Sequence, residues 1–342
     1  MAKKSTPKKS TTKKDASTGK LQFADDTMFK FLSESAPLAD TTEWLSTNMP
    51  NVDVLLTRGK GVPFGKIIEI YGKEASGKTA LCQYLIGEVQ KAGGYAFYID
   101  FEASYDSEHV ACYNIDKKRL LYYAPETAEE AFTGMFQVLD NSKKYEPFII
   151  VVDSVAAMVA DAEKSDDAKT QVAGVPRVMS NKLRKLLVRL AGKRGFVVFT
   201  NQIRDKINTT AFGEKTTRPG GHALDFYSSI IINTYVKETL KVSVGGKDRN
   251  TGFVISMTNK KNRKGIPKES TEVVLSFEAG VSAPLTTLRA LLREGVLKKR
   301  GTKIVYESEE YTKDTLLEKI KTSPDEFGKL YLNHIFKQSR KD

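Results

Sequence analysis

The feature that most constrains the fold is the stretch from Gly72 to Thr79, which fits the pattern G-x-x-x-x-G-K-[S/T]. An apolar run precedes it at 67–71, and a helical pattern follows it at 80–90. In this setting the glycines let the backbone curl so that successive N–H groups and the positive end of the next helix face phosphate oxygens. The sequence therefore predicts a loop that binds a nucleoside triphosphate. Its predicted residues are Gly72, Lys73, Glu74, Ala75, Ser76, Gly77, Lys78, Thr79 and Ala80.

Three side chains in this context predict ATP and Mg²⁺ as ligands. Lys78 is expected to reach the β and γ phosphates, and Thr79 to offer a hydroxyl to Mg²⁺. Asp153 ends the apolar run FIIVVDSV, where a carboxylate either holds the metal or caps a helix. Beside a phosphate-binding loop we favour the metal role.

Apolar runs that alternate with helical patterns predict the fold class. Runs at 65–72, 95–102, 148–155, 196–203 and 228–236 alternate with helical patterns at 79–92, 126–140 and 176–193. Nearly continuous Val, Ile and Phe residues indicate strands of a parallel sheet that is covered on both faces. We therefore predict an α/β core, two further strands joined by a basic connector between 251 and 280, and a small C-terminal domain after Gly280.

The first fifty residues have a different character. Residues 1–20 carry seven lysines and one acid, within a chain of 342 residues and net charge +12. A tail of this composition cannot bury enough apolar surface to fold, so we predict that residues 1–24 are disordered. Its lysines serve either solubility or polyanion binding. Apolar residues between Met28 and Leu32 predict a short amphipathic helix in segment 25–50. No apolar run is long enough to span a bilayer, so we expect no membrane association and a place in the cytoplasm.

Two acids and an amide are predicted to lie near the phosphates, because parallel strands deliver their ends to one edge of a sheet. Asp100 and Glu102 end one run, and either one orients the attacking water or closes a loop. We favour Glu102 as the base because its side chain is longer. Gln202 ends another run and leads into a polar segment, 205–221, that is either a functional loop or a solvated one.

A second polar segment, 160–176, leads into a basic helical stretch, RVMSNKLRKLLVRL. Basic residues on a helix form a solvated face in most proteins, but the same residues can bind a phosphate backbone. The sequence leaves both interpretations open.

These motifs, taken in order, resemble those of the RecA family of homologous recombinases, in its bacterial and phage branch. The resemblance covers roughly 44–299 and rests on VPFGKIIEIYGKEASGKTAL, FYIDFEASYD, IIVVDSVAAMV, VMSNKLRKL, FTNQIRDKI and RPGGHALDFYSS. It implies a RecA-like ATPase core at 51–280 with a mostly parallel sheet, an N-terminal docking helix at 25–50 and a small α/β C-terminal domain at 281–342. It also implies the cytoplasm of a bacterial or phage-infected cell.

The resemblance further implies a DNA-dependent ATPase that forms a helical filament on single-stranded DNA and exchanges strands with a duplex. The implied partners are single- and double-stranded DNA, other copies of the chain, and a mediator or single-strand-binding protein. The implied roles are water activation by Glu102, γ-phosphate sensing by Gln202, and charge stabilisation on a neighbour's ATP by Lys261 and Arg263. Adenine contacts are implied for Asp106 and His109. DNA contacts are implied for Arg177, Ser180, Arg184, Arg204, Ile207, Gly220 and Gly221.

The sequence departs from the family pattern at several positions. Arg263 replaces the usual lysine, Asp225 stands where bacterial members often carry lysine, and Asp205 replaces an apolar residue. The family's acidic C-terminal tail is absent from this sequence, which ends FKQSRKD.

The alternative function is a RecA-fold DNA motor or regulatory ATPase, such as a helicase-like ring, without strand exchange. A small-molecule kinase is the third class.

Overall fold

The structure is a computed structural model that describes residues 13–14, 21–22, 41, 43–103, 105, 110–163, 174–205 and 216–338. It divides into two units, residues 1–40 and 41–342. In the first unit, strands β1 (Lys13–Lys14) and β2 (Leu21–Gln22) pair antiparallel. The predicted amphipathic helix and most of the predicted tail lie outside the described residues.

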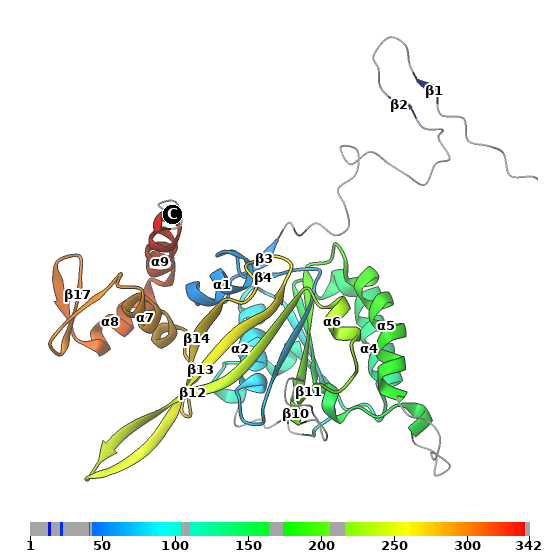
Figure 1. The fold of residues 1–342 in the computed structure, drawn as a ribbon, viewed down its shortest axis with the longest axis horizontal. Helices are drawn as coiled ribbons and strands as arrows, with labels where there is room; N and C mark the ends of the chain where they lie inside the picture. Colours follow the sequence, from blue (N-terminus) through cyan, green and yellow to red (C-terminus); the bar gives the residue numbers. More distant parts are fainter. Residues whose placement is uncertain are drawn as a thin grey trace, which may run out of the picture. The chain divides into compact units, whose positions relative to one another are not determined.

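The second unit is built on one large sheet (Figure 1), which has nine strands within the described residues. In spatial order these are β15 (Gly280–Val281), β14 (Ser270–Ser276), β13 (Lys247–Asn262), β12 (Ile230–Val244), β5 (Ile67–Gly72), β9 (Gly195–Gln202), β8 (Phe148–Asp153), β6 (Tyr95–Asp100) and β7 (Leu120–Tyr123).

The strands from β12 to β7 run parallel, whereas β13, β14 and β15 continue the sheet antiparallel. The predicted mostly parallel α/β core is therefore confirmed. The register places Gly72 beside Gln202 and Asp100 beside Asp153. The carboxyl ends of β5, β9, β8 and β6 consequently share one edge.

Within the described residues, the helices that accompany the sheet and its connections are α1 (Pro50–Thr57), α2 (Lys78–Lys91), α4 (Ala128–Asp140), α5 (Gly174–Leu190) and α6 (Ala223–Tyr227). Short 3-10 helices lie at Lys117–Arg119, Ser142–Lys144, Val155–Ala157 and Asp161–Glu163. Short strand pairs join β3 (Trp44–Leu45) to β4 (Val62–Pro63) and β10 (Arg204–Asp205) to β11 (Thr216–Thr217).

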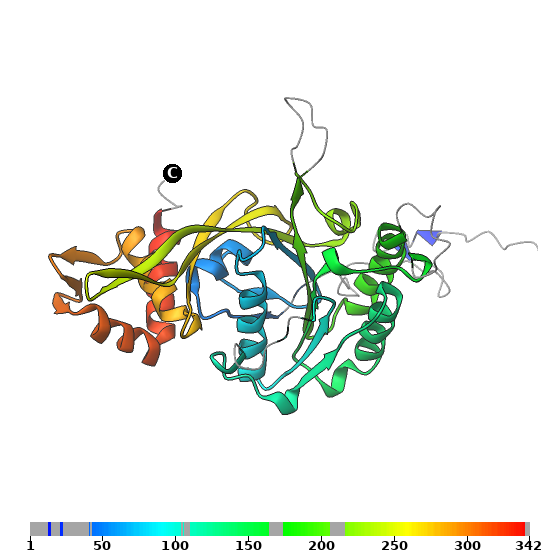
Figure 2. The same cartoon turned by 90° about the horizontal axis from the view of Figure 1, so that it is seen from below.

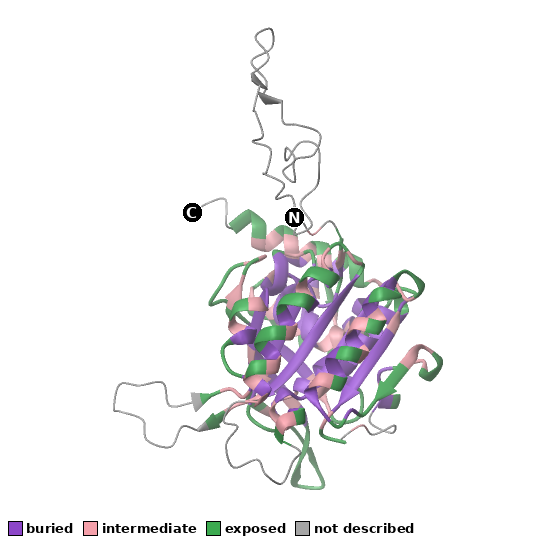
Figure 3. Cartoon of the chain, turned by 90° about the vertical axis from the view of Figure 1, so that its right-hand side faces the viewer, coloured by how far each residue is buried: buried purple, intermediate pink, exposed green. Residues whose placement is uncertain are grey.

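Alternate residues of each central strand enter two separate cores. In β8, Ile149 and Val151 pack with α1 and α2, whereas Ile150 and Val152 pack with α4, α5 and α6. Figures 2 and 3 show these helices on the two faces of a buried sheet. Because successive strand residues point to opposite faces, a strand covered on both must be apolar throughout.

Helix ends and apolar spacing explain the local structure. Thr127 caps α4 by accepting a hydrogen bond from the Glu130 N–H, and its apolar residues recur at helical spacing. In α5 the buried residues are Val175, Met179, Leu183, Leu186 and Leu190, which leaves the basic side chains on the opposite face.

Strands β12 and β13 form a longer hairpin than the sequence analysis predicted. Strand β12 continues to Val244 and strand β13 begins at Lys247, and this end of the hairpin projects from the sheet (Figure 1). Gly245 and Gly246, both with positive φ, form the turn between them. The projecting end has no buried face: Val242 and Val244 are 51% and 53% exposed, although they alternate with polar residues.

The C-terminal residues have an apolar cluster of their own. They form α7 (Ala283–Arg293), β16 (Lys298–Arg300), β17 (Lys303–Tyr306), β18 (Glu309–Tyr311), α8 (Lys313–Thr322) and α9 (Pro324–Gln338). Leu291, Leu316 and Phe327 are fully buried at its centre. Arg289 joins this lobe to the main sheet through ion pairs with Glu238 and Glu272.

Candidate functional site

The predicted phosphate-binding loop lies at the carboxyl end of β5 and opens α2. Gly77 caps α2 with φ +84°, and a Cβ there would lie 2.2 Å from Ile255. A Cβ on Gly72 would lie 2.3 Å from the Thr234 carbonyl oxygen. Both glycines are therefore required by the backbone and by its close approach to β12 and β13.

Lys78 spans the loop that it is predicted to serve. Its Nζ donates a hydrogen bond of 2.9 Å to the Lys73 carbonyl oxygen, and only 8% of the residue is exposed. Burial lowers the pKa of the Lys78 ammonium group, while Asp153 and Glu102 oppose that effect. The ammonium group thus lies in a cradle of backbone groups with carboxylates nearby.

Asp153 is buried at the end of β8 and accepts hydrogen bonds from three hydroxyl groups. Thr79 donates to Oδ2 at 2.8 Å, Tyr98 donates to Oδ2 at 2.7 Å, and Thr200 donates to Oδ1 at 2.5 Å. Burial raises the pKa of the Tyr98 hydroxyl, so it remains a donor. The contact between Thr79 and Asp153 joins two hard oxygen donors, a pair that suits Mg²⁺.

The two acids that follow β6 have different surroundings. Asp100 is buried and accepts hydrogen bonds from the backbone N–H groups of Glu102 and Tyr105. Glu102 is exposed, and its Oε1 accepts hydrogen bonds from the Ser154 hydroxyl and the Gln202 amide. Asp100 therefore shapes the loop, while Glu102 faces the open strand edge.

Gln202 brings the ends of two strands together. Its Nε2 lies 3.1 Å from Glu102 Oε1, across a gap of one hundred residues in sequence. The backbone N–H of the next residue, Ile203, bonds to the Gly72 carbonyl oxygen. Gln202 thus lies between the phosphate-binding loop and Glu102, just before the polar segment at 205–221.

Helix α5 presents the predicted DNA-contacting residues Arg177, Ser180 and Arg184 on one exposed face. Their spacing of three and four residues places them in a row. Arg189 lies on the same helix, but it pairs with Asp140 and stacks on Phe136. The row is therefore a cationic surface next to the polar segment at 160–176, of which the structure describes 160–163 and 174–176.

The described ends of the polar segment at 205–221 lie close to the 3-10 helix Val155–Ala157 and to the start of α5. Strand β10 pairs with β11, and Arg204 donates a hydrogen bond to the Ala156 carbonyl oxygen. Gly220 and Gly221 have positive φ, and Cβ atoms on them would lie 2.7 Å from Val155 and 3.1 Å from Pro176. The two polar segments therefore begin and end on one side of the molecule.

Lys261 and Arg263 do not lie beside their own phosphate-binding loop. Both side chains donate hydrogen bonds to the Phe226 carbonyl oxygen of α6. Lys261 also donates to the Asp225 carbonyl oxygen. The backbone of Arg263 bonds to Ser229, which bonds to Ile67 at the start of β5. Because strands rise about 3.3 Å per residue, Gly72 lies roughly 16 Å further along that strand. The predicted site residues Asp106, His109 and Ile207 lie outside the described residues.

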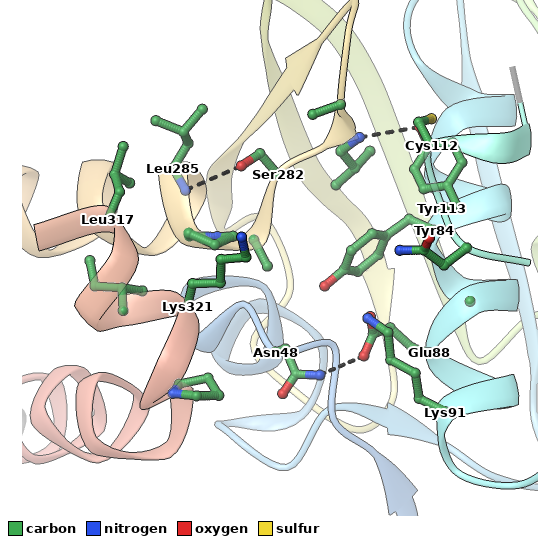
Figure 4. A pocket seen from close by; sticks show the side chains of 18 of the residues that line it. Asn48, Tyr84, Glu88, Lys91, Cys112, Tyr113, Ser282, Leu285, Leu317 and Lys321 are labelled. Atoms are coloured by element: carbon green, nitrogen blue, oxygen red, sulfur yellow. Dashed lines mark hydrogen bonds and ion pairs between the residues drawn. The ribbon is translucent and has the colours of Figure 1, made fainter. Parts of the chain in front are cut away.

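The larger cavities among the described residues lie away from the phosphate-binding loop. One, of about 530 Å³, lies between α2, β15 and α8, where Asn48 donates a hydrogen bond to Glu88 (Figure 4). The other, of about 600 Å³, lies between β7 and α4. Neither is lined by any of the described residues to which we assign nucleotide or DNA contacts.

A glycine loop with a lysine and a threonine, at the carboxyl edge of a parallel sheet and beside a buried aspartate, defines a P-loop ATPase. The family model of the RecA N-terminal domain matches residues 19–282. The chain therefore belongs to the RecA family. None of the helices in the described ranges combines the length and apolarity needed to cross a membrane.

Similar proteins support this membership. Protein RecA of Mesomycoplasma hyopneumoniae is 35% identical over 291 residues, which cover 85% of this chain and 83% of that protein. Protein RecA of Ureaplasma parvum is 33% identical over 75% of each chain. Protein RecA of Chloroherpeton thalassium is 33% identical over 84% of this chain and 79% of its own length.

Sequence reasoning missed the residues that orient the site. Tyr98, Ser154 and Thr200 bond to Asp153 or Glu102, although none was singled out. Ser154 directly follows Asp153, and Thr200 lies two residues before Gln202, so adjacency to predicted residues was an available signal. Tyr98 lies within a continuous apolar run, where an aromatic residue reads as core.

Proposed function

We propose that this chain is an ATP-dependent recombinase that forms a helical filament on single-stranded DNA and promotes homologous pairing and strand exchange. The observation that carries this proposal is the hydrogen bond between Glu102 and Gln202. It joins a carboxylate suited to activate water with the residue that precedes the polar segment at 205–221, whose end at Gly221 lies against Pro176 of α5. Nucleotide chemistry and DNA contact are thereby connected within one subunit.

The nucleotide site fits ATP and Mg²⁺. Backbone N–H groups of 72–79 and the Lys78 ammonium group would hold the phosphates, and Thr79 and Asp153 would hold the metal. When bound, Mg²⁺ neutralises charge on the β and γ phosphates. Glu102 is placed to accept a proton from the attacking water, while Gln202 orients that carboxylate. Asp106 and His109 stay predicted adenine contacts.

Contact with DNA is proposed along α5 and the two polar segments. Arg177, Ser180 and Arg184 supply donors for phosphate oxygens, and Gly220 and Gly221 allow close approach of the backbone. Contacts of this kind leave base edges free, so complementary pairing with a duplex supplies the specificity. Arg204 and Ile207 are further proposed contacts.

Lys261 and Arg263 are proposed to act on the ATP of a neighbouring subunit. Their distance from their own phosphate-binding loop supports action in trans. Guanidinium and ammonium groups at a developing phosphate charge lower the barrier electrostatically. A filament, in which each site is completed by the next subunit, meets this requirement.

The self-association surface is proposed at the edge strand β7. Leu121, Tyr122 and Tyr123 are 42 to 49% exposed, and a cavity separates them from α4. An edge strand offers unpaired backbone groups to another chain. We assign this surface to segment 25–45 of a neighbouring copy, whose apolar spacing predicts a docking helix. The proposed location is the cytoplasm of a bacterial or phage-infected cell.

The proposal is tested by measuring ATP hydrolysis with and without single-stranded DNA at several salt concentrations, with electron micrographs of the same samples. A recombinase gives DNA-stimulated hydrolysis that weakens with salt, and helical filaments. Rings, or hydrolysis indifferent to DNA, would favour a RecA-fold motor or regulator instead. A mediator or single-strand-binding protein is a proposed partner in loading.

A further inference from the structure

Arg218 forms the centre of a charge cluster that the function described above does not use. It follows β11 directly, at the end of the polar segment that begins after Gln202. Its guanidinium group pairs with Glu69 of β5 and with Asp225 of α6, and lies 4.4 Å above the Tyr71 ring. One side chain thus joins the loop end to a strand and a helix.

The Glu69 carboxylate, which Arg218 pairs with, is buried. Its side chain is 1% exposed, and its other oxygen accepts a hydrogen bond of 3.1 Å from Asn201. Burial raises the pKa of Glu69, and Arg218 opposes that effect. Arg218 is the only cationic partner of Glu69 among the described residues, and leaving a buried carboxylate unpaired destabilises the fold. Moving Arg218 away therefore requires the residues around Glu69 to rearrange.

The cluster lies immediately upstream of two residues of the nucleotide site. Glu69 and Tyr71 precede Gly72 on β5, and Asn201 precedes Gln202 on β9. Asn201 also donates a hydrogen bond of 3.0 Å to the Pro219 carbonyl oxygen. A displacement of the loop end therefore acts on both strands just before they reach the phosphates.

The cluster also reaches the basic pair. Asp225, held by Arg218, lies on α6, whose carbonyl oxygens accept hydrogen bonds from Lys261 and Arg263. The same cluster therefore holds the loop end and the two residues that we propose act on a neighbouring subunit.

We infer that Arg218 is a positioning residue that couples DNA binding to nucleotide occupancy of the phosphate-binding loop. This inference rests on the proposed function, because it requires that the chain binds DNA. Coupling between two ligands is reciprocal, so it is measured as the ratio of DNA affinities in two nucleotide states.

The test uses full-length Arg218→Gln and measures the affinity for an oligo-dT probe with a non-hydrolysable ATP analogue and with ADP. Wild-type protein is expected to bind at least about five-fold more tightly with the analogue, and the variant is expected to bring this ratio close to one. The matched control is Arg289→Gln, because Arg289 also bridges two carboxylates, Glu238 and Glu272. This control is expected to keep the wild-type ratio.

A second variant separates coupling from folding. Arg218→Gln combined with Glu69→Gln removes the buried unpaired charge, so its thermal denaturation is expected to lie closer to wild type than that of the single variant. Its affinity ratio is still expected to be close to one. A wild-type ratio in either Arg218 variant would overturn the inference and leave Arg218 a structural residue. Absence of nucleotide-dependent DNA binding in the wild type would instead overturn the proposed function.

Discussion

The Gln202 side-chain amide donates a hydrogen bond of 3.1 Å to the Glu102 carboxylate, joining the ends of β9 and β6. The Ser154 hydroxyl donates to the same oxygen. Two donors on Oε1 orient the carboxylate of Glu102, which is an exposed residue. The geometry therefore suits a general base held in place before the nucleotide arrives.

Replacing Glu102 with Gln is expected to lower ATP hydrolysis by about 10² to 10⁴, because the amide cannot accept the proton of water. Nucleotide binding and filament formation are expected to persist, because the phosphate-binding loop is unchanged. Turnover and binding of a fluorescent ATP analogue measure the two effects. Ser154→Ala, which removes only one orienting bond, serves as the comparison and is expected to reduce turnover less. Near-normal turnover of Glu102→Gln would exclude it as the base.

Arg263→Ala is expected to impair hydrolysis while the isolated subunit binds ATP normally, because Arg263 lies at the far end of β5 from its own phosphate-binding loop. Mixing this variant with Lys78→Ala measures action in trans. Each inactive variant supplies what the other lacks, so the mixture is expected to recover part of the wild-type rate. A mixture no more active than its components would contradict action on a neighbour.

Arg184→Ala is expected to weaken binding of single-stranded DNA and to reduce the slope of log affinity against log salt by about 0.7, the loss of one phosphate contact. Fluorescence anisotropy at several salt concentrations measures the slope. Arg189→Ala is the control on the same helix, because Arg189 already pairs with Asp140. Equal slopes for both variants would indicate that the row on α5 does not contact phosphates.

Asp53 predicts a pH dependence of stability. Burial raises its pKa from 3.8 to about 6, although Thr47 and Ser46 donate hydrogen bonds to it. A carboxyl whose pKa is raised by folding stabilises the protein below pH 3.8, and this stabilisation is lost as the pH rises through 6. The change corresponds to roughly 3 kcal/mol of unfolding free energy.

The measurement is chemical denaturation of wild type and Asp53→Asn between pH 4 and 7. The stability of wild type relative to the variant is expected to fall across this range by roughly 2 to 3 kcal/mol. The difference between the two proteins removes the contribution of other titrating groups. A difference that stays constant with pH would show that the Asp53 pKa is not raised.

Short sequence patterns were enough to predict the fold class and the position of the phosphate-binding loop. The glycine loop with Lys78 and Thr79 predicted a nucleotide site, and the apolar runs correctly predicted the parallel sheet, because strands buried on both faces and phosphate loops need particular residues at fixed spacing. The sequence also placed Asp153, Glu102 and Gln202 at strand ends.

Only the tertiary structure decided which of these residues meet. Asp100 and Glu102 look alike in sequence, and the loop backbone turns one inward as a cap and leaves the other facing Gln202. The projecting end of the hairpin of β12 and β13 and the ion pair between Glu69 and Arg218 also escaped prediction. The contacts of Glu102 with Gln202 and of Glu69 with Arg218 join residues a hundred or more positions apart, and spacing along the chain carries no record of them. They are set by how the strands pair and how the helices pack.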